Sequence, residues 1–240
     1  MITSNGTFIM EGLDKEDSKR LKNHKELTKL VNTIGFLPLF KSNVAGFSVE
    51  EQTDKNAWWT GEISEDPWEW RALIAGEGEI AYGKLFSGKA GFISKEWYPV
   101  IAAYRRDGYD FDSRYEDGLA SRKAKNIIDV LTEHKTLFSY ELKALAGFGK
   151  GGEKGFDTVM TTLQMQTYIT VRGFVRKKNK KNQEYGWPVA VYSLSEDLFG
   201  EEYVTSGYGL SAGEAKDKIV KQLQQYYPEA SIEELRKCIK

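Results

Sequence analysis

The stretch from Ser121 to Leu194 restricts the possible folds more than any other part of the chain. Apolar residues at helical spacing predict a helix over 122–132, followed by a short strand and a second helix over 140–146 capped by Ser139. The glycine-rich turn GFGKGG (147–152) then leads into a third helix over 153–165. Two strands follow, over 168–175 and 187–194, and KKNKKNQEYG (177–186) joins them. This order is typical of a winged helix, a helix-turn-helix variant with a β-hairpin wing.

The charge distribution favours a nucleic-acid role for this stretch. Residues 121–183 contain thirteen Lys or Arg and five Asp or Glu, a balance of +8, whereas the whole chain has a formal net charge of −1. Six of the positive residues lie between Arg172 and Lys181 with no acid among them. Because duplex DNA carries a phosphate charge about every 1.7 Å of its axis, a basic hairpin is suited to hold it. We therefore expect double-stranded DNA as the partner.

The predicted DNA contacts lie on the third helix, the turn before it and the wing. The polar face of the third helix offers threonines, which suit groove edges and phosphates, and the wing cations are expected to hold the backbone rather than read sequence. The alternative is that the helix face and the hairpin tip are only solvated and contact no DNA. The predicted contact residues are Lys150, Lys154, Thr158, Thr161, Thr162, Arg172, Arg176, Lys177, Lys178, Lys180 and Lys181.

A dense aromatic cluster, WWTGEISEDPWEWR (58–71), lies in the first half of the chain. Trp58, Trp59, Trp68 and Trp70 are candidates for stacking on a flipped or single-stranded base. The alternative is that they form core and inter-domain packing, and the neighbouring acids favour this alternative. Asp66-Pro67 within the cluster predicts a helix start, with Pro67 at the first helical position.

Composition and motif searches exclude several classes of protein. One cysteine, Cys238, fits a reducing cytoplasm, and no apolar run is long enough for a membrane span. His24, His134 and Cys238 lack the spacing of a metal site, so we expect no metal. The glycines of GFGKGG satisfy the dinucleotide pattern literally, but a helix precedes them where that fingerprint needs a strand, so we expect no cofactor.

The rest of the chain completes an α+β fold. The acidic stretch YDFDSRYEDG (109–118) predicts a solvated linker and a domain boundary, and two C-terminal helices are expected within 212–239. The predicted division is an N-terminal α+β domain rich in Trp over 1–118, a winged-helix domain with a basic wing over 119–200, and a C-terminal helical segment over 201–240.

Several strings carry a resemblance to a known family. They are GFLPLF, GFSVEE, DPWEWR, AYGKLF, KAGFISKEWYP, YRRDGYDFDSRYEDGLASR, GFGKGG and LQMQTY. Over about residues 30–235 the chain resembles AlkZ-related proteins, a group similar to the AlkZ and YcaQ bacterial DNA glycosylases. The resemblance implies tandem winged-helix-like units, the N-terminal half forming a second one, and an enzyme class that excises alkylated bases without metal or cofactor.

The resemblance also implies where catalysis would occur. The signature of the true glycosylases is Gln-x-Gln or Gln-x-Asp in the first winged helix, and the comparable segment here, IGFLPLF, has neither glutamine nor carboxylate. A Gln-x-Gln, Gln164-Met165-Gln166, lies in the later module and provides the candidate catalytic residues. The alternative is that Gln164 and Gln166 satisfy backbone groups at a helix-to-strand junction. Whether the chain is an enzyme therefore stays open.

Three functional hypotheses follow. The first is a winged-helix DNA-binding protein on an AlkZ-like scaffold that recognises damaged or distorted duplex and has no catalytic activity. The second is a monofunctional DNA glycosylase that excises alkylated bases. The third is a protein-interaction module.

Overall fold

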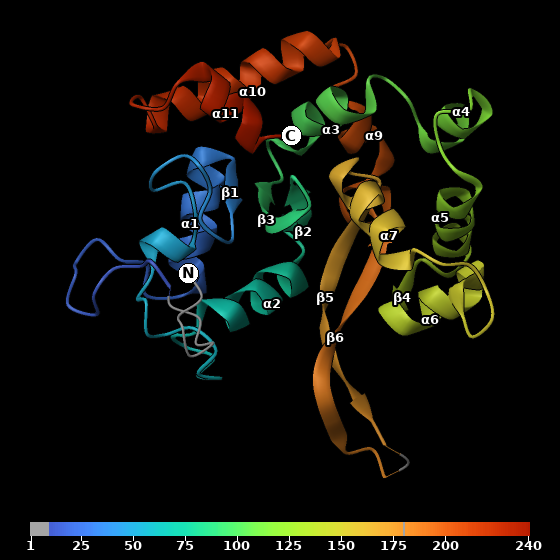
Figure 1. The fold of residues 1–240 in the computed structure, drawn as a ribbon, viewed down its shortest axis with the longest axis horizontal. Helices are drawn as coiled ribbons and strands as arrows, with labels where there is room; N and C mark the ends of the chain where they lie inside the picture. Colours follow the sequence, from blue (N-terminus) through green and yellow to red (C-terminus); the bar gives the residue numbers. More distant parts are fainter. Residues whose placement is uncertain (1–9, 180) are drawn as a thin grey trace. The chain divides into compact units, whose positions relative to one another are not determined.

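The computed structural model describes residues 10–179 and 181–240 (Figure 1). The chain forms a mixed α+β fold with two compact units, one of residues 1–97 and 216–240 and the other of residues 98–215. These bounds differ from the predicted division at residues 118 and 200. None of the helices in the described part of the chain is long and apolar enough to cross a membrane.

The first unit combines helices with antiparallel strands. Its elements are α1 (His24–Ile34), β1 (Phe36–Pro38), the short 3₁₀ helix η1 (Glu50–Gln52), α2 (Pro67–Glu77), β2 (Ile80–Phe86) and β3 (Lys89–Ser94). β3 pairs with both β1 and β2, so the last of these three strands in sequence lies between the other two. The predicted helix start at Asp66-Pro67 is confirmed, because the Asp66 carboxylate accepts from the Trp68 N–H and Pro67 opens α2.

The C-terminal helices α10 (Ala212–Tyr226) and α11 (Ile232–Cys238) form as predicted. From residue 216 onward they belong to the first unit. The Gln222 side-chain amide donates to the carbonyl oxygens of Thr33 and Ile34 at the end of α1. Tyr227 packs on Phe47 with ring centroids 5.0 Å apart. These contacts hold α10 and Tyr227 against the end of α1 and Phe47.

The second unit begins with α3 (Tyr98–Arg106) and α4 (Phe111–Glu116). It continues with α5 (Arg122–His134), β4 (Thr136–Phe138), α6 (Ser139–Lys143), the short π-helix η2 (Ala144–Phe148), α7 (Phe156–Met165), β5 (Ile169–Lys178), β6 (Glu184–Leu194), α8 (Ser195–Phe199) and α9 (Glu201–Thr205). β6 pairs antiparallel with both β4 and β5. From α5 to β6, the element order is the one predicted from the sequence.

The α1–β3 segment of the first unit and the α5–β6 segment of the second therefore share the same strand connections and a similar order of elements. Each has a helix, a short strand, a helix and a hairpin, and in each the final strand pairs with both others. The turn from the first helix to the short strand is also alike. Gly35 (φ 96°) and Lys135 (φ 64°) adopt positive φ, and their N–H groups donate to Val31 and Leu131 at 2.7 and 2.8 Å.

The core of the α5–β6 segment confirms the predicted helix stripes. Ala124, Ile127, Ile128 and Leu131 of α5 pack with Phe156, Met160 and Leu163 of α7, all of them buried. Phe111 of α4 joins this cluster and meets Tyr168 edge-on at 5.2 Å. The prediction of a solvated linker over 109–118 was wrong, because Asp110 caps α4 and Phe111 supplies apolar surface to the core.

Three further local predictions need correction. The second helix starts at Ser139 itself, with Phe138 as its N-cap residue, so Ser139 does not cap it. The third helix starts at Phe156 rather than residue 153, because the turn is longer than expected. Gly147 adopts φ 85°, and a Cβ at Gly152 would lie 2.2 Å from the Gly147 oxygen, so the turn needs glycine at both positions. The wing strands are also longer than the predicted 168–175 and 187–194.

Candidate nucleic-acid interface

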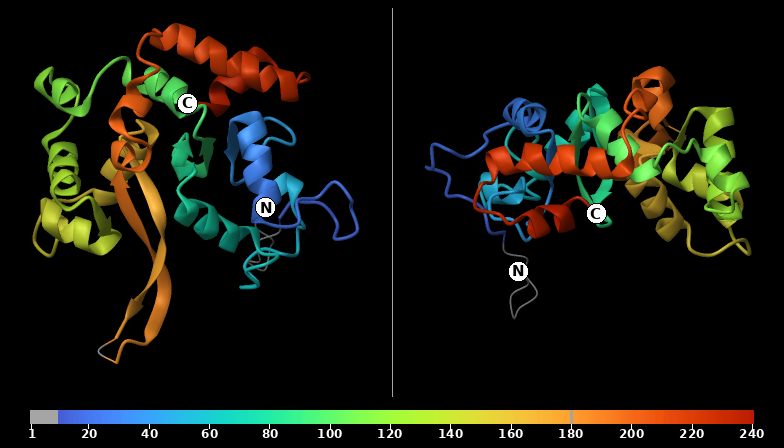
Figure 2. Two further views of the ribbon diagram at one scale, coloured as in Figure 1. Left: turned by 180° about the vertical axis from the view of Figure 1, so that it is seen from behind. Right: turned by 90° about the horizontal axis from the view of Figure 1, so that it is seen from above.

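The β5–β6 hairpin is the most extended feature of the second unit. Its strands span Ile169–Lys178 and Glu184–Leu194, and at about 3.4 Å per residue each is roughly 30 Å long. Figures 1 and 2 show its distal half extending beyond α5, α6 and α7 of the same unit. Burial follows this geometry, since Ile169, Thr170 and Val171 are buried while the residues near the turn are exposed.

The wing cations lie on this exposed hairpin, and those that the structure describes have no acidic partner. Arg176, Lys178 and Lys181 are exposed, and Arg172 and Lys177 are half-buried. Within the described residues none of these five cations takes part in an ion pair. Glu184 is the one acid in the sequence from residue 169 to 194. Lys180, also predicted as a contact, lies outside the described residues.

Two of the wing cations have structural contacts that orient them. The Arg176 guanidinium donates through Nη1 to the Gly186 carbonyl oxygen at 2.8 Å, across the hairpin. The Lys177 ammonium lies 4.2 Å from the centre of the Tyr140 ring, a cation–π contact to the start of α6. Arg176 and Lys177 therefore brace the hairpin, whereas Lys178 and Lys181 project from it.

Helix α7 presents the predicted threonines to solvent in part. Thr158 and Thr162 are exposed and Thr161 is half-buried. The Thr161 and Thr162 hydroxyls donate to the carbonyl oxygens of Asp157 and Thr158, four residues earlier, at 2.7 and 3.1 Å. They retain acceptor capacity, and a hydroxyl can rotate away from such a bond to meet a ligand.

The two lysines before α7 are exposed on the glycine-rich turn. Lys150 follows the π-helix, and Lys154 precedes the first residue of α7 by two positions. The Lys154 carbonyl oxygen accepts from the Lys123 ammonium at 2.9 Å, and Lys123 also pairs with Glu153 at 2.9 Å. These contacts fix the turn to α5 while leaving the ammonium groups of Lys150 and Lys154 at the surface.

The junction between α7 and the wing is held by a buried arginine. Thr167 adopts φ 64°, which is strained for a β-branched residue, and its carbonyl oxygen accepts from Arg106 Nη2 at 2.5 Å and from the Tyr98 hydroxyl at 2.9 Å. Arg106 Nε also donates to the Thr167 hydroxyl at 3.1 Å. The guanidinium is paired with Glu196 at the start of α8. This network sets the direction in which the hairpin leaves α7.

Protonation in this network follows from burial and charge. Burial alone lowers the pKa of Arg106, but the Glu196 carboxylate and the Tyr208 and Tyr98 phenols outweigh burial and raise that pKa above its usual value. Burial raises the pKa of Tyr98 to about 12 despite the opposing charge of Arg106. Arg106 is therefore a fixed cation and Tyr98 a neutral hydrogen-bond donor at physiological pH.

The candidate catalytic glutamines do not form a pair of accessible side chains. Gln164 is buried, and its amide donates to the Met160 carbonyl oxygen at 3.0 Å inside the helix. Gln166 follows the end of α7 and is half-buried, with its N–H donating to Thr162 at 2.9 Å. For Gln164 this arrangement matches the alternative role of satisfying backbone groups near the helix end.

The four tryptophans of the 58–71 cluster differ in accessibility. Trp58 and Trp70 are buried, and the Trp58 indole donates to the Thr53 hydroxyl at 3.0 Å. Trp68 is half-buried with the Arg71 guanidinium 3.7 Å from its ring centre, and Trp59 is 45% exposed. Packing therefore accounts for Trp58 and Trp70, and only Trp59 and Trp68 present ring surface to solvent.

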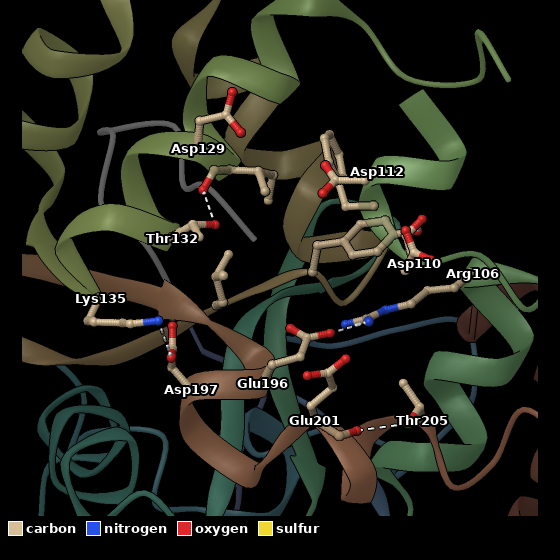
Figure 3. A pocket seen from close by; sticks show the side chains of 14 residues that line it. Arg106, Asp110, Asp112, Asp129, Thr132, Lys135, Glu196, Asp197, Glu201 and Thr205 are labelled. Atoms are coloured by element: carbon tan, nitrogen blue, oxygen red, sulfur yellow. Dashed lines mark hydrogen bonds and ion pairs between the residues drawn. The ribbon is translucent and has the colours of Figure 1, made fainter. Parts of the chain in front are cut away.

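The second unit also contains an acidic pocket of about 520 Å³ (Figure 3). Arg106–Glu196 and Lys135–Asp197 form ion pairs at its wall. Further carboxylates outnumber these two cations, and the acids that line it are Asp110, Asp112, Asp129, Glu196, Asp197 and Glu201. Within the described residues no group of acidic, His or Cys side chains has the arrangement of a metal site. The pocket would repel phosphate, so the basic hairpin is the better candidate for a DNA backbone.

The roles of two residues of this region were not predicted from the sequence. Trp187 was treated as the start of a strand, yet it is 83% exposed. Pro188 was a usable signal, because proline cannot donate to a sheet ladder and marks an edge or a bulge. The role of Arg106 had no such signal, since its partners Thr167, Glu196 and Tyr208 are 61, 90 and 102 residues away.

A family model described as "AlkZ related" matches residues 21–240. The chain belongs to the AlkZ-related family. Among solved structures, the fold is similar to the Streptomyces sahachiroi DNA glycosylase AlkZ, with 13% sequence identity and a TM-score of 0.46. The similarity covers 92% of this chain and 60% of that one, so the chain spans well under the full length of that enzyme. No curated protein matches this chain.

Proposed function

We propose that this AlkZ-related protein is a DNA-binding protein with two winged-helix-like units, in which the β5–β6 wing holds the backbone of a duplex. The observation that carries the proposal is the charge of the wing. Lys178 and Lys181 are exposed beside Arg172, Arg176 and Lys177, and no acid pairs with any of them in the described part of the chain. Such unneutralised cations release counterions when they meet phosphates, which drives association.

The element order supports the same proposal. α7 occupies the position of the recognition helix, between the second helix and the wing strands, and it presents Thr158 and Thr162 to solvent. Lys150 and Lys154 lie on the turn that precedes it. We propose that these residues contact the groove edge and adjacent phosphates, with recognition of damaged or distorted duplex as the biological task.

Membership of the AlkZ-related family favours a second candidate, a monofunctional glycosylase that excises alkylated bases. We place it second because the Gln164 side chain is buried and bonded to the helix backbone. The two candidates separate at Gln164→Ala/Gln166→Ala. Duplex affinity of this variant should stay within about twofold of the parent, and base release from 7-methylguanine DNA should disappear only if the glutamines are catalytic.

The proposed function is tested by duplex binding across a salt series. If three wing cations contact phosphates, the logarithm of the association constant should fall against the logarithm of salt concentration with a slope of roughly −2.7. Lys178→Ala/Lys181→Ala should make that slope shallower by about 1.8 and weaken binding on the order of 30-fold at 0.15 M salt. The matched control is Lys25→Ala/Lys29→Ala on α1, which removes the same charge from two exposed lysines of the other unit.

The outcomes are distinct. Equal losses in the wing variant and the α1 variant would assign binding to overall charge rather than to the wing. A salt-independent parent, or one that does not bind duplex at low salt, would exclude both DNA candidates and leave the protein-interaction hypothesis.

A further inference from the structure

The distal wing contains a bulge that displays a tryptophan. Val175 pairs with Val189 and Lys177 pairs with Tyr185, so Arg176 alone lies opposite Gly186, Trp187 and Pro188 of β6. Gly186 adopts φ 71°, which a glycine tolerates without strain, and Pro188 occupies a position where no ladder N–H is needed. The Arg176 bond to the Gly186 carbonyl oxygen closes the bulge from the opposite strand.

The result is an indole held away from the protein. Trp187 is 83% exposed, and Tyr185 and Val175 beside it are 52% and 43% exposed. Trp187 makes no ring contact or hydrogen bond through its side chain with any residue that the structure describes. A β-bulge commonly redirects a side chain, and here the sequence places the largest apolar side chain at that position.

The surroundings of Trp187 favour one kind of partner. Arg176, Lys177 and Lys178 lie on the strand opposite it, and Lys181 lies at the turn. A nucleic acid with an exposed base fits these surroundings. Its phosphates can meet the cations, which have no ion-pair partner among the described residues, and its base can stack on the indole ring. Base stacking on an aromatic side chain needs no particular sequence, which suits a wing that holds backbone.

We propose that Trp187 stacks on an unpaired base, so that the wing prefers DNA with a locally opened strand over perfectly paired duplex. The proposal rests on the proposed function, because the wing must first reach the backbone. The bulge positions the indole, Arg176 fixes the bulge, and Lys178 and Lys181 supply the phosphate contacts. Trp187 thereby adds a preference for an opened site to DNA binding that is otherwise electrostatic.

The test compares three DNAs of one sequence, fully paired, with a one-nucleotide gap and with a single bulged thymine, using the full chain. Trp187→Ala should weaken binding to the gapped and bulged DNAs by roughly 5- to 150-fold, the range that stacking of one base provides. Binding to paired duplex and its salt slope should change by less than about twofold. Trp187→Phe should recover most of the loss, and Tyr226→Ala, which truncates an exposed aromatic residue on α10, serves as the control.

Each outcome decides the proposal. Selective loss on the opened DNAs with recovery by phenylalanine supports it. Equal effects of Trp187→Ala on all three DNAs, or no effect, overturn it while the proposed function stands on the paired duplex. A parent that binds no DNA overturns both. Binding to phosphatidylserine vesicles that Trp187→Ala abolishes, without binding to DNA, would assign the indole to a membrane surface.

Discussion

The Arg106–Glu196 pair offers a direct test of how the α7–wing junction is held. Arg106 is 1% exposed and Glu196 is 26% exposed, so the cation is the more deeply buried member. Glu196→Gln keeps an oxygen that accepts from the guanidinium but removes the charge that balances it. Breaking a buried ion pair by removing one partner typically costs about 3–5 kcal/mol. Because water reaches Glu196, which is 26% exposed, we expect a loss at or just below the lower limit of that range, about 2–3 kcal/mol.

Substitution of the cation removes charge and hydrogen bonds together. Arg106→Met removes the buried cation, yet it also removes the donors that hold the Thr167 carbonyl and hydroxyl oxygens. Each lost bond contributes on the order of 1 kcal/mol, so we expect a loss of about 2–4 kcal/mol. The loss in the double variant should be smaller than the sum of the two single-variant losses by about 1–3 kcal/mol, because both single changes break the same pair.

The assay is equilibrium unfolding in urea, followed by far-UV circular dichroism for the parent, both single variants and the double variant. A change in midpoint at constant slope reports the loss in free energy of unfolding. A loss below about 0.5 kcal/mol for Glu196→Gln, or single losses that simply add, would refute the reasoning, because the pair would then not be coupled.

Further predictions follow from the same structure. Because the pKa of Tyr98 is raised to about 12, its neutral form stabilises the fold below pH of about 10, and that contribution is lost as pH rises toward 12. The slope of the free energy of unfolding against pH across this interval should therefore report about one proton fewer in Tyr98→Phe than in the parent. Gly207→Ala would bring a Cβ to 2.2 Å from the Pro99 carbonyl oxygen and should lower the free energy of unfolding by about 1–3 kcal/mol, whereas Gly209→Ala, with nothing within 4 Å, should change it by less than about 0.5 kcal/mol in the same urea titration. Arg176→Gln should leave the bulge carbonyl less firmly held and raise amide exchange rates around Gly186, and an exchange pattern equal to that of the parent would contradict the bracing role.

The sequence predicted the elements from Ser121 to Leu194 because apolar periodicity there coincides with clear turn signals. The stripe of Ala124, Ile127, Ile128 and Leu131 is fully used by the core. The helix start at Phe156 was missed because Gly155 supplies the N-cap position without a side-chain cap, which leaves no residue signal at that boundary. Such boundaries depend on the turn geometry of Gly147 and Gly152 rather than on local propensity.

The parts that sequence reasoning missed depend on contacts between residues far apart. Phe111 belongs to the core through Tyr168, although its neighbours are so acidic that the segment resembled a linker. The buried position of Trp70 and the exposed position of Trp187 are likewise set by packing, since residue type is the same at both positions. Residue type predicted the kind of chemistry available, and only the fold distinguishes a packed indole from one that can meet a ligand.

The most direct test of the central claim is the salt dependence of duplex binding by the parent and by Lys178→Ala/Lys181→Ala, measured by fluorescence anisotropy. Between roughly 50 and 200 mM salt the parent should lose about 40-fold in affinity if three wing cations contact phosphate, and the wing variant should lose far less over the same range. Identical salt slopes for the parent and the wing variant would contradict the account.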